Sequence, residues 1–157
     1  MASNHSEDTY DMHSLEKSLL VVFCFEKFHP RLNLEQREGT HQDCQGLCKL
    51  FETTYGFESE IHHDLERTRL LLKFEGLKNR KLKNRPSLVL AFLSHGNQRG
   101  IFARDGLFEL KDVIQAFNRD NCYELKGKPK IILVQVQSIT MVFKRQPSLA
   151  LLVIQIL

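Results

Sequence analysis

The apolar residues of this chain gather in short runs that alternate with stretches of helical periodicity. The apolar runs cover residues 18–25, 57–62, 87–93 and 130–136, and the helical stretches cover residues 40–55, 66–79 and 110–117. A continuous run such as Leu88–Leu93 is typical of a strand that is buried on both faces, as in parallel sheets. The alternation predicts a three-layer α/β/α fold with a mostly parallel sheet of about four strands, covered by helices on both faces.

Local signals mark the ends of several of these elements. Thr40 is placed to cap the first helix, and Asp43 three residues later can complete a capping box. Gly56 suits the left-handed residue that ends this helix, and Asp105-Gly106 is a hairpin turn signal. The periodicity predicts inward helix faces made of Cys44, Leu47, Cys48, Phe51 and Tyr55, and of Leu70, Leu71, Phe74 and Leu77.

The pattern divides the chain into one domain and two terminal segments. Residues 1–14 are expected to form a flexible tail, and residues 15–136 carry the alternating pattern. Residues 137–157 depart from it and end in an almost wholly apolar run from Leu149 to Leu157. Such a run needs a partner surface or becomes an aggregation hazard, and it is too short to span a bilayer.

The composition favours a globular domain over other classes of protein. The 157 residues are 42% hydrophobic and 26% charged, which predicts a globular domain with a core of its own. The net charge of +3 is too balanced to indicate a nucleic-acid or membrane partner, and neither is predicted. The N-terminus is acidic before the first apolar run, which is the opposite of a signal peptide.

The four cysteines form no dense framework of the kind found in small secreted domains. This usage predicts a reducing compartment, the cytoplasm with the nucleus as an alternative, and Cys24 is expected to be a buried free thiol. A zinc site could be built from Cys44, Cys48, His41, His62 and His63. Core packing is preferred, because both cysteines lie on the inward face of the predicted helix, and no metal or other cofactor is predicted.

The basic run from Lys78 to Arg85 has two interpretations. It could serve nuclear import or an acidic partner, or it could be a solvated linker between two elements. The linker is preferred, because a short charge run usually lies on a solvated surface.

A histidine follows the third apolar run, in the sequence Ser94-His95-Gly96. Open α/β sheets form their sites at the carboxyl ends of the strands, so His95 lies where a functional side chain is expected. Gly96 lets the backbone turn sharply and leaves room beside the ring.

Several segments together resemble the caspase family, the Asp-specific cysteine proteases of peptidase family C14. Ser94-His95-Gly96 looks like the catalytic histidine segment, and Arg37-Glu38-Gly39-Thr40 resembles the family's Arg-x-Gly-Thr segment. Phe28 to Leu34 matches the loop that leads to this segment, and Gly127 to Gln135 resembles the strand that delivers the nucleophile. The resemblance covers about residues 10–136, which correspond to the large-subunit region of the family.

The resemblance implies roles for individual residues. His95 is implied to be the general base or acid, and Gly96 to contribute backbone on the oxyanion side. Arg37 and Gln135 are implied to line the pocket for the substrate aspartate.

Both pocket residues also have a structural alternative. Arg37 could pair with the neighbouring Glu35 or Glu38, and this alternative is preferred because the other half of the pocket is missing. Gln135 could equally be a strand-end amide that bonds to backbone.

The sequence departs from the family at Gln137. The family signature around the nucleophile is Gln-Ala-Cys-x-Gly, whereas this chain reads Gln135-Val136-Gln137-Ser138-Ile139. An amide cannot form a thiolate or accept an acyl group, so the nucleophilic step is predicted to be absent and His95 to be vestigial. Ser138 would need a one-residue slip at the strand end to replace it, and Cys122 matches a position that is not catalytic in the family.

The sequence also departs from the family after the fourth apolar run. In caspases a small-subunit segment follows there, and residues 138–157 do not resemble it. We therefore expect a caspase-family homologue that is inactive in this form and acts, if at all, as a decoy or regulator. Its expected partners are other caspases or apoptotic regulators, bound through an open strand edge at residues 130–136. Two alternatives stay open: a truncated or splice-variant product of an active effector-like caspase gene that cleaves proteins after Asp, and a fragment that does not fold stably.

Overall fold

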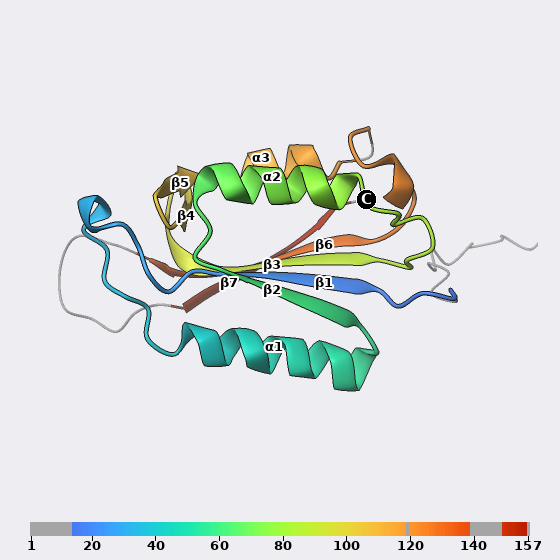
Figure 1. Ribbon diagram of the computed structural model, residues 1–157, viewed down its shortest axis with the longest axis horizontal. Helices are drawn as coiled ribbons and strands as arrows, with labels where there is room; N and C mark the ends of the chain where they lie inside the picture. Colours follow the sequence, from blue (N-terminus) through green and yellow to red (C-terminus); the bar gives the residue numbers. More distant parts are fainter. Residues whose placement is uncertain (1–13, 119, 139–148, 157) are drawn as a thin grey trace, which may run out of the picture.

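The computed structural model describes residues 14–118, 120–138 and 149–156 and arranges them in three layers (Figure 1). In chain order the strands and helices are β1 (Leu19–Cys24), α1 (Thr40–Tyr55), β2 (Glu58–His63), α2 (Arg67–Lys78), β3 (Leu88–Asn97), β4 (Gly100–Ala103), β5 (Gly106–Phe108), α3 (Leu110–Ala116), β6 (Lys130–Ser138) and β7 (Leu149–Ile156). Short 3-10 turns lie at Pro30–Leu32 and Tyr123–Leu125.

The sheet is built around β3, which pairs in parallel with β1 on one side and with β6 on the other. β2 pairs in parallel with β1, so the parallel part has the order β2-β1-β3-β6 and confirms the predicted α/β class. Antiparallel strands are added at two places, β7 beside β6 and the hairpin β4-β5 after β3. The described residues therefore form seven strands rather than about four, because these additions do not follow the strand–helix alternation.

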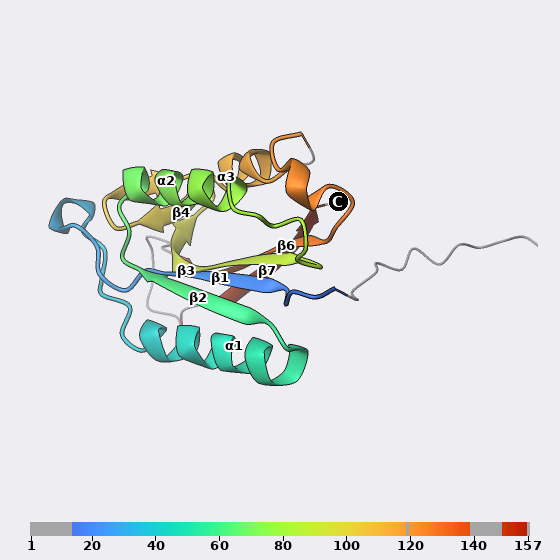
Figure 2. The same cartoon turned by 45° about the vertical axis from the view of Figure 1, so that its right-hand side comes forward.

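Helices cover both faces of the sheet, as the two views in Figures 1 and 2 show. α1 lies on one face, and α2 and α3 lie on the other. Successive side chains of a strand point to opposite faces, so β1 sends Val21 and Phe23 toward α2 and Val22 and Cys24 toward α1. This double burial is the reason why the central strands are continuous apolar runs in the sequence.

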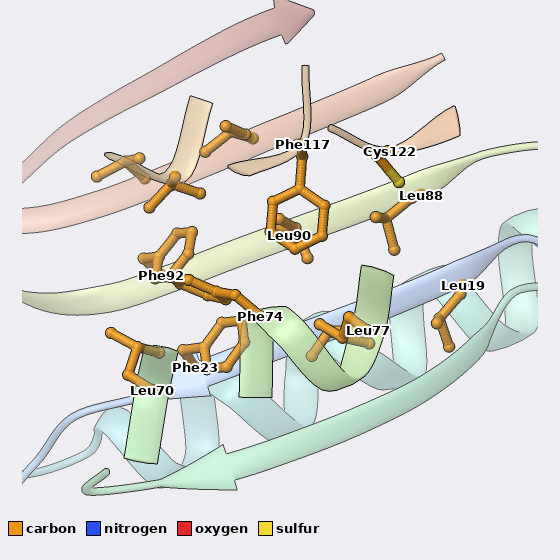
Figure 3. Packing of buried hydrophobic residues seen from close by; sticks show 14 of the residues in the cluster. Leu19, Phe23, Leu70, Phe74, Leu77, Leu88, Leu90, Phe92, Phe117 and Cys122 are labelled. Atoms are coloured by element: carbon orange, nitrogen blue, oxygen red, sulfur yellow. The ribbon is translucent and has the colours of Figure 1, made fainter. Parts of the chain in front are cut away.

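The larger core, between the sheet and α2 and α3, is built on packed aromatic rings (Figure 3). Phe23 and Phe92 on adjacent strands stack with their ring centroids 5.0 Å apart. Phe74 of α2 meets Phe23 edge-on at 5.5 Å and Phe117 at 5.7 Å. Aromatic pairs of this kind each add about 0.5–1.5 kcal/mol beyond the burial of their area, so the cluster fixes α2 against the sheet.

The smaller core joins α1 to the other face of the sheet, and a disulfide crosses it. Cys24 at the end of β1 is bonded to Cys44 of α1, with their Cα atoms 6.4 Å apart. The expectation of a free thiol at Cys24 is therefore wrong, because the strand alternation and the helix face bring the two side chains together. The bond also removes Cys44 from any zinc site, whereas Cys48 is a free and buried thiol.

The ends and faces of the helices differ from the prediction in three places. Gly39, with φ of +86°, is the N-cap of α1 and no side chain caps this helix, so Thr40 and Asp43 form no capping box. Tyr55 and Leu71 are 62% and 55% exposed, so neither lies on the predicted inward face. Tyr55 is the last residue of α1, and Leu71 lies outside the narrow stripe that a helix buries.

Two other local signals behave as predicted. Gly56 ends α1 with φ of +68°, the left-handed conformation that glycine adopts without strain. The β4-β5 hairpin forms where Asp105-Gly106 predicts it, with Arg104 and Asp105 in the turn and Gly106 as the first residue of β5, opposite Ala103. Among the described residues, no helix has the length and apolar character needed to cross a membrane.

The predicted open edge at residues 130–136 is wrong. β7 pairs with β6 in antiparallel fashion, from Lys130 opposite Ile156 to Gln137 opposite Leu149. The apolar run near the C-terminus thus meets its hydrogen-bonding partner within the same chain. β6 itself continues to Ser138, while residues 1–13 and 139–148 of the two predicted tails lie outside the described residues.

Reduction of the disulfide is expected to lower the free energy of unfolding by about 3 kcal/mol, because the bond constrains the unfolded chain between two positions 20 residues apart. Denaturant unfolding with and without dithiothreitol measures this loss. The matched control is Cys44→Ser, whose stability should not respond to the reductant.

A thiol titration checks the same bond independently. Unfolding without reductant should expose only the two free thiols, Cys48 and Cys122. Titration of all four cysteines, or the lack of a cooperative unfolding transition, would contradict the structure.

Candidate functional site

The residues singled out in the sequence meet at the carboxyl ends of β1, β3 and β6. β3 and β6 stay in register to their ends, so that His95 lies opposite Gln137 and Gly96 opposite Ser138. The chain leaves β1 into the loop of residues 25–39, which carries Arg37. This is the edge at which an open parallel sheet places its functional groups.

His95 is held by the loop that follows β1. The side chain is 5% exposed, and Nε2 donates a hydrogen bond to the backbone oxygen of Glu35 at 2.7 Å. The ring packs against Phe28 with centroids 5.1 Å apart. Because Nε2 carries the proton for this bond, Nδ1 of the neutral ring is an acceptor, and this atom is buried without a partner.

Gly96 is required by the packing of β3 against its neighbours. A Cβ atom at this position would lie 2.8 Å from Cγ1 of Val136 and 3.1 Å from the backbone oxygen of Gly100. The close approach explains the glycine by sterics alone, since no side chain fits between the end of β3, β6 and the start of β4.

Arg37 is enclosed rather than exposed. Only 7% of the residue is accessible, and one terminal nitrogen donates to the backbone oxygen of Phe25 at 3.3 Å, while Nε is buried without a partner. Burial lowers the pKa of this guanidinium, and the charges of Asp43 and Glu26 partly oppose the effect.

The preferred alternative for Arg37, an ion pair with Glu35 or Glu38, is wrong. Neither pair occurs among the ion pairs of the described residues, which include all three side chains. The reason is that the guanidinium turns into the protein and donates to the backbone oxygen of Phe25, the first residue of the loop, instead of meeting a neighbouring carboxylate.

Gln135 faces a groove between α1 and the sheet. The groove has a volume of about 430 Å³ and is lined by Gln42, Asp43, Gly46, Leu47, Leu50, Ala91, Leu93, Leu133 and Gln135. The amide oxygen of Gln135 is buried and has no hydrogen-bond partner. The predicted alternative, in which the amide bonds to backbone, is therefore not observed for this oxygen. The groove is thus mostly apolar, with one unsatisfied acceptor.

The unsatisfied polar atoms of the protein concentrate in these residues. Four buried side-chain nitrogen or oxygen atoms in the described part of the chain have no partner, and three of them belong to Arg37, His95 and Gln135. Native proteins leave few such atoms, and local rules are broken mainly at functional sites. The candidate site therefore contains buried polar atoms that form no hydrogen bond in the folded protein.

None of the four cysteines offers an exposed free thiol. Cys24 and Cys44 are bonded to each other, and Cys48 and Cys122 are buried. Burial is the main cause that raises the pKa of both free thiols, which keeps them in the protonated form that is a poor nucleophile. In the register of β6, the residue beside His95 is Gln137.

The histidines of the possible zinc site and the basic run from Lys78 to Arg85 form contacts within the fold. The ring of His41 lies against that of His63, with centroids 4.9 Å apart. In the basic run, Arg85 pairs with Glu58 at 2.9 Å, and Arg80 pairs with Glu60. These cations tie the run to β2, so the run is attached to the sheet instead of being a free solvated linker.

The residues that contact His95 could not be predicted from the sequence. Phe28 belongs to the loop segment that carried the family resemblance, but nothing in its type or spacing indicated an aromatic support for the histidine. Glu35 contributes its backbone oxygen, which leaves no signal in the sequence.

The fold and the site together define an α/β domain with a buried histidine at the end of its central parallel strand. A family model described as the caspase domain matches residues 17–146. The chain therefore belongs to the caspase-domain family.

Curated relatives agree with this assignment. Caspase-6 of Mus musculus is 31% identical over 128 residues, which are 82% of this chain and 46% of the relative. Caspase-6 of Bos taurus is 32% identical over 82% of this chain and 43% of the relative, and caspase-3 of Felis catus is 28% identical over 83% and 47%. The chain spans about half the length of the curated relatives it matches.

The packing at Gly96 gives a direct test of the β3-β6 register. Gly96→Ala is expected to lower the free energy of unfolding by about 1–3 kcal/mol, because the added methyl overpacks against Val136. In the double variant Gly96→Ala/Val136→Ala, part of this loss should be recovered relative to Val136→Ala alone. Equal losses in both backgrounds, measured by denaturant unfolding, would show that the two side chains are not in contact.

Proposed function

We propose that this chain is a caspase-family protein without peptidase activity of its own, and that it regulates active caspases by binding them. The observation that carries the proposal is the register of β3 and β6, in which Gln137 lies opposite His95. A caspase-type mechanism needs a thiolate beside this histidine. The carboxamide of Gln137 can neither ionise nor carry an acyl group.

The hydrogen bonding and burial of His95, Arg37 and the free cysteines also support the absence of a nucleophilic step. The proton of His95 Nε2 is already directed to a backbone oxygen, and both free thiols are buried. Arg37, which the family resemblance places in the pocket for the substrate aspartate, is almost completely enclosed. His95 thus ties the loop to β3, and Arg37 ties the loop to its own first residue.

A regulator needs a surface that a caspase can use, and β7 supplies one. Within the described residues β7 pairs only with β6, so the backbone groups of its outer edge have no partner strand there. An unpaired edge strand is a template for strand addition. The regulator binds through this edge in the cytoplasm, with the nucleus as an alternative compartment.

A second candidate function rests on the coverage of the relatives. Because the chain spans about half of their length, it is also compatible with a truncated or splice-variant product of an active effector-like caspase that cleaves proteins after Asp. A longer transcript in which Gln135 continues into Ala-Cys-x-Gly and a small subunit would decide for this function.

The loss of activity is tested with the purified chain and fluorogenic peptides that carry aspartate before the scissile bond. No product above the blank is expected, because the residue beside His95 forms no thiolate. His95→Ala serves as the control and should give the same blank rate. Turnover by the natural chain that His95→Ala abolishes would contradict the proposal.

The regulatory role is tested by co-purification with an active caspase. The full chain is expected to retain the caspase, and Leu152→Pro/Val153→Pro should abolish retention, because one of two neighbouring strand residues directs its backbone N–H outward and proline removes that donor without deleting the strand that covers β6. Lys49→Glu on α1 is the control and should retain the caspase like the natural chain. Failure of the full chain to bind any caspase would remove the regulatory role without restoring activity.

A further inference from the structure

The outer surface of α2 exposes two adjacent leucines. The inner side of the helix is buried through Leu70, Phe74 and Leu77, whereas Leu71 and Leu72 are 55% and 59% exposed. Singly exposed leucines are ordinary, but Leu72 also lines a hollow on this side of the helix.

A groove lies beside Leu72 along one side of α2. Its volume is about 380 Å³, and it is lined by Leu65, Arg69, Leu72, Lys73, Gly76, Leu77 and Arg80. The space above Gly76 is empty, since a Cβ atom at this position would meet no atom within 4 Å. The groove therefore combines an apolar wall with a cationic rim.

Two of the three cations are not engaged in an ion pair, although the charge of Lys73 acts on the carboxylate of Glu60. Arg80 is paired with Glu60, and the nearby Lys78 is paired with Glu75 at 2.5 Å. Neither Arg69 nor Lys73 takes part in an ion pair among the described residues. Being four residues apart on one helix, they project from the same side, with Cβ atoms about 5–6 Å apart.

We propose that this groove, which we call the α2 groove, binds an acidic peptide segment of a partner protein. An aliphatic side chain of the segment lies over Gly76 and against Leu72, and flanking carboxylates pair with Arg69 and Lys73. Charge complementarity selects this occupant, since a cationic rim around an apolar floor attracts carboxylates next to a leucine-like residue.

The α2 groove is independent of the proposed regulatory function. α2 covers the sheet face opposite to α1, and the edge strand β7 is not part of the groove (Figure 1). A membrane surface is a poorer fit than a peptide, because the site is concave and offers only two cations outside ion pairs.

The test uses the full chain and a short fluorescent peptide in which two adjacent leucines lie between glutamates. Fluorescence anisotropy should show saturable binding that weakens with salt. Arg69→Glu/Lys73→Glu is expected to reduce the affinity at least about tenfold. Gly76→Leu should reduce it similarly by filling the groove, and Lys49→Glu on α1 should leave it unchanged.

A stability control separates blocked binding from unfolding. Gly76→Ala is expected to raise the melting temperature, because alanine favours the helix and its methyl meets no neighbour. Gly76→Leu should therefore remain folded by circular dichroism.

Three results would overturn the proposal. The first is that the acidic peptide shows no saturable binding. The second is that a peptide with glutamines in place of the glutamates binds equally well. The third is that Gly76→Leu leaves the affinity unchanged. Preferential binding to phosphatidylserine vesicles over the peptide would assign the surface to a membrane instead.

Discussion

The parallel pairing of β3 with β6 is the interaction on which the rest of the structure depends. The two strands remain in register from Leu88 opposite Lys130 to Gly96 opposite Ser138. One strand carries the histidine, and the other brings Gln137 beside it. A shift of one residue would turn every side chain of β6 to the opposite face, and it would place a different residue next to His95.

Three interactions of different kinds hold the loop after β1 and the elements at its two ends. The disulfide joins the end of β1 to α1 at Cys44, and His95 bonds to the backbone of Glu35 within the loop. Arg37 turns inward to the backbone of Phe25. The side chains of His95 and Arg37 are therefore both hydrogen-bonded to backbone oxygens of the loop.

The site nevertheless retains polar atoms that packing does not need. Burying a polar atom without a hydrogen bond costs about 1–3 kcal/mol, and Arg37, His95 and Gln135 each contain one such atom. A sequence shaped by stability alone would replace these side chains with apolar ones. These three side chains therefore lower the stability of the domain relative to apolar residues of the same shape.

The sequence by itself determined the strand–helix alternation, the family and the missing thiol, because each is a local pattern: apolar runs, helical periodicity and the residue type at position 137. It did not determine that Cys24 meets Cys44, that Leu149–Ile156 closes the edge of β6, or that Arg37 is enclosed. These features join residues distant in the chain, and spacing alone carries no record of such contacts. Only the tertiary structure decided them, through side-chain direction and the packing of the layers.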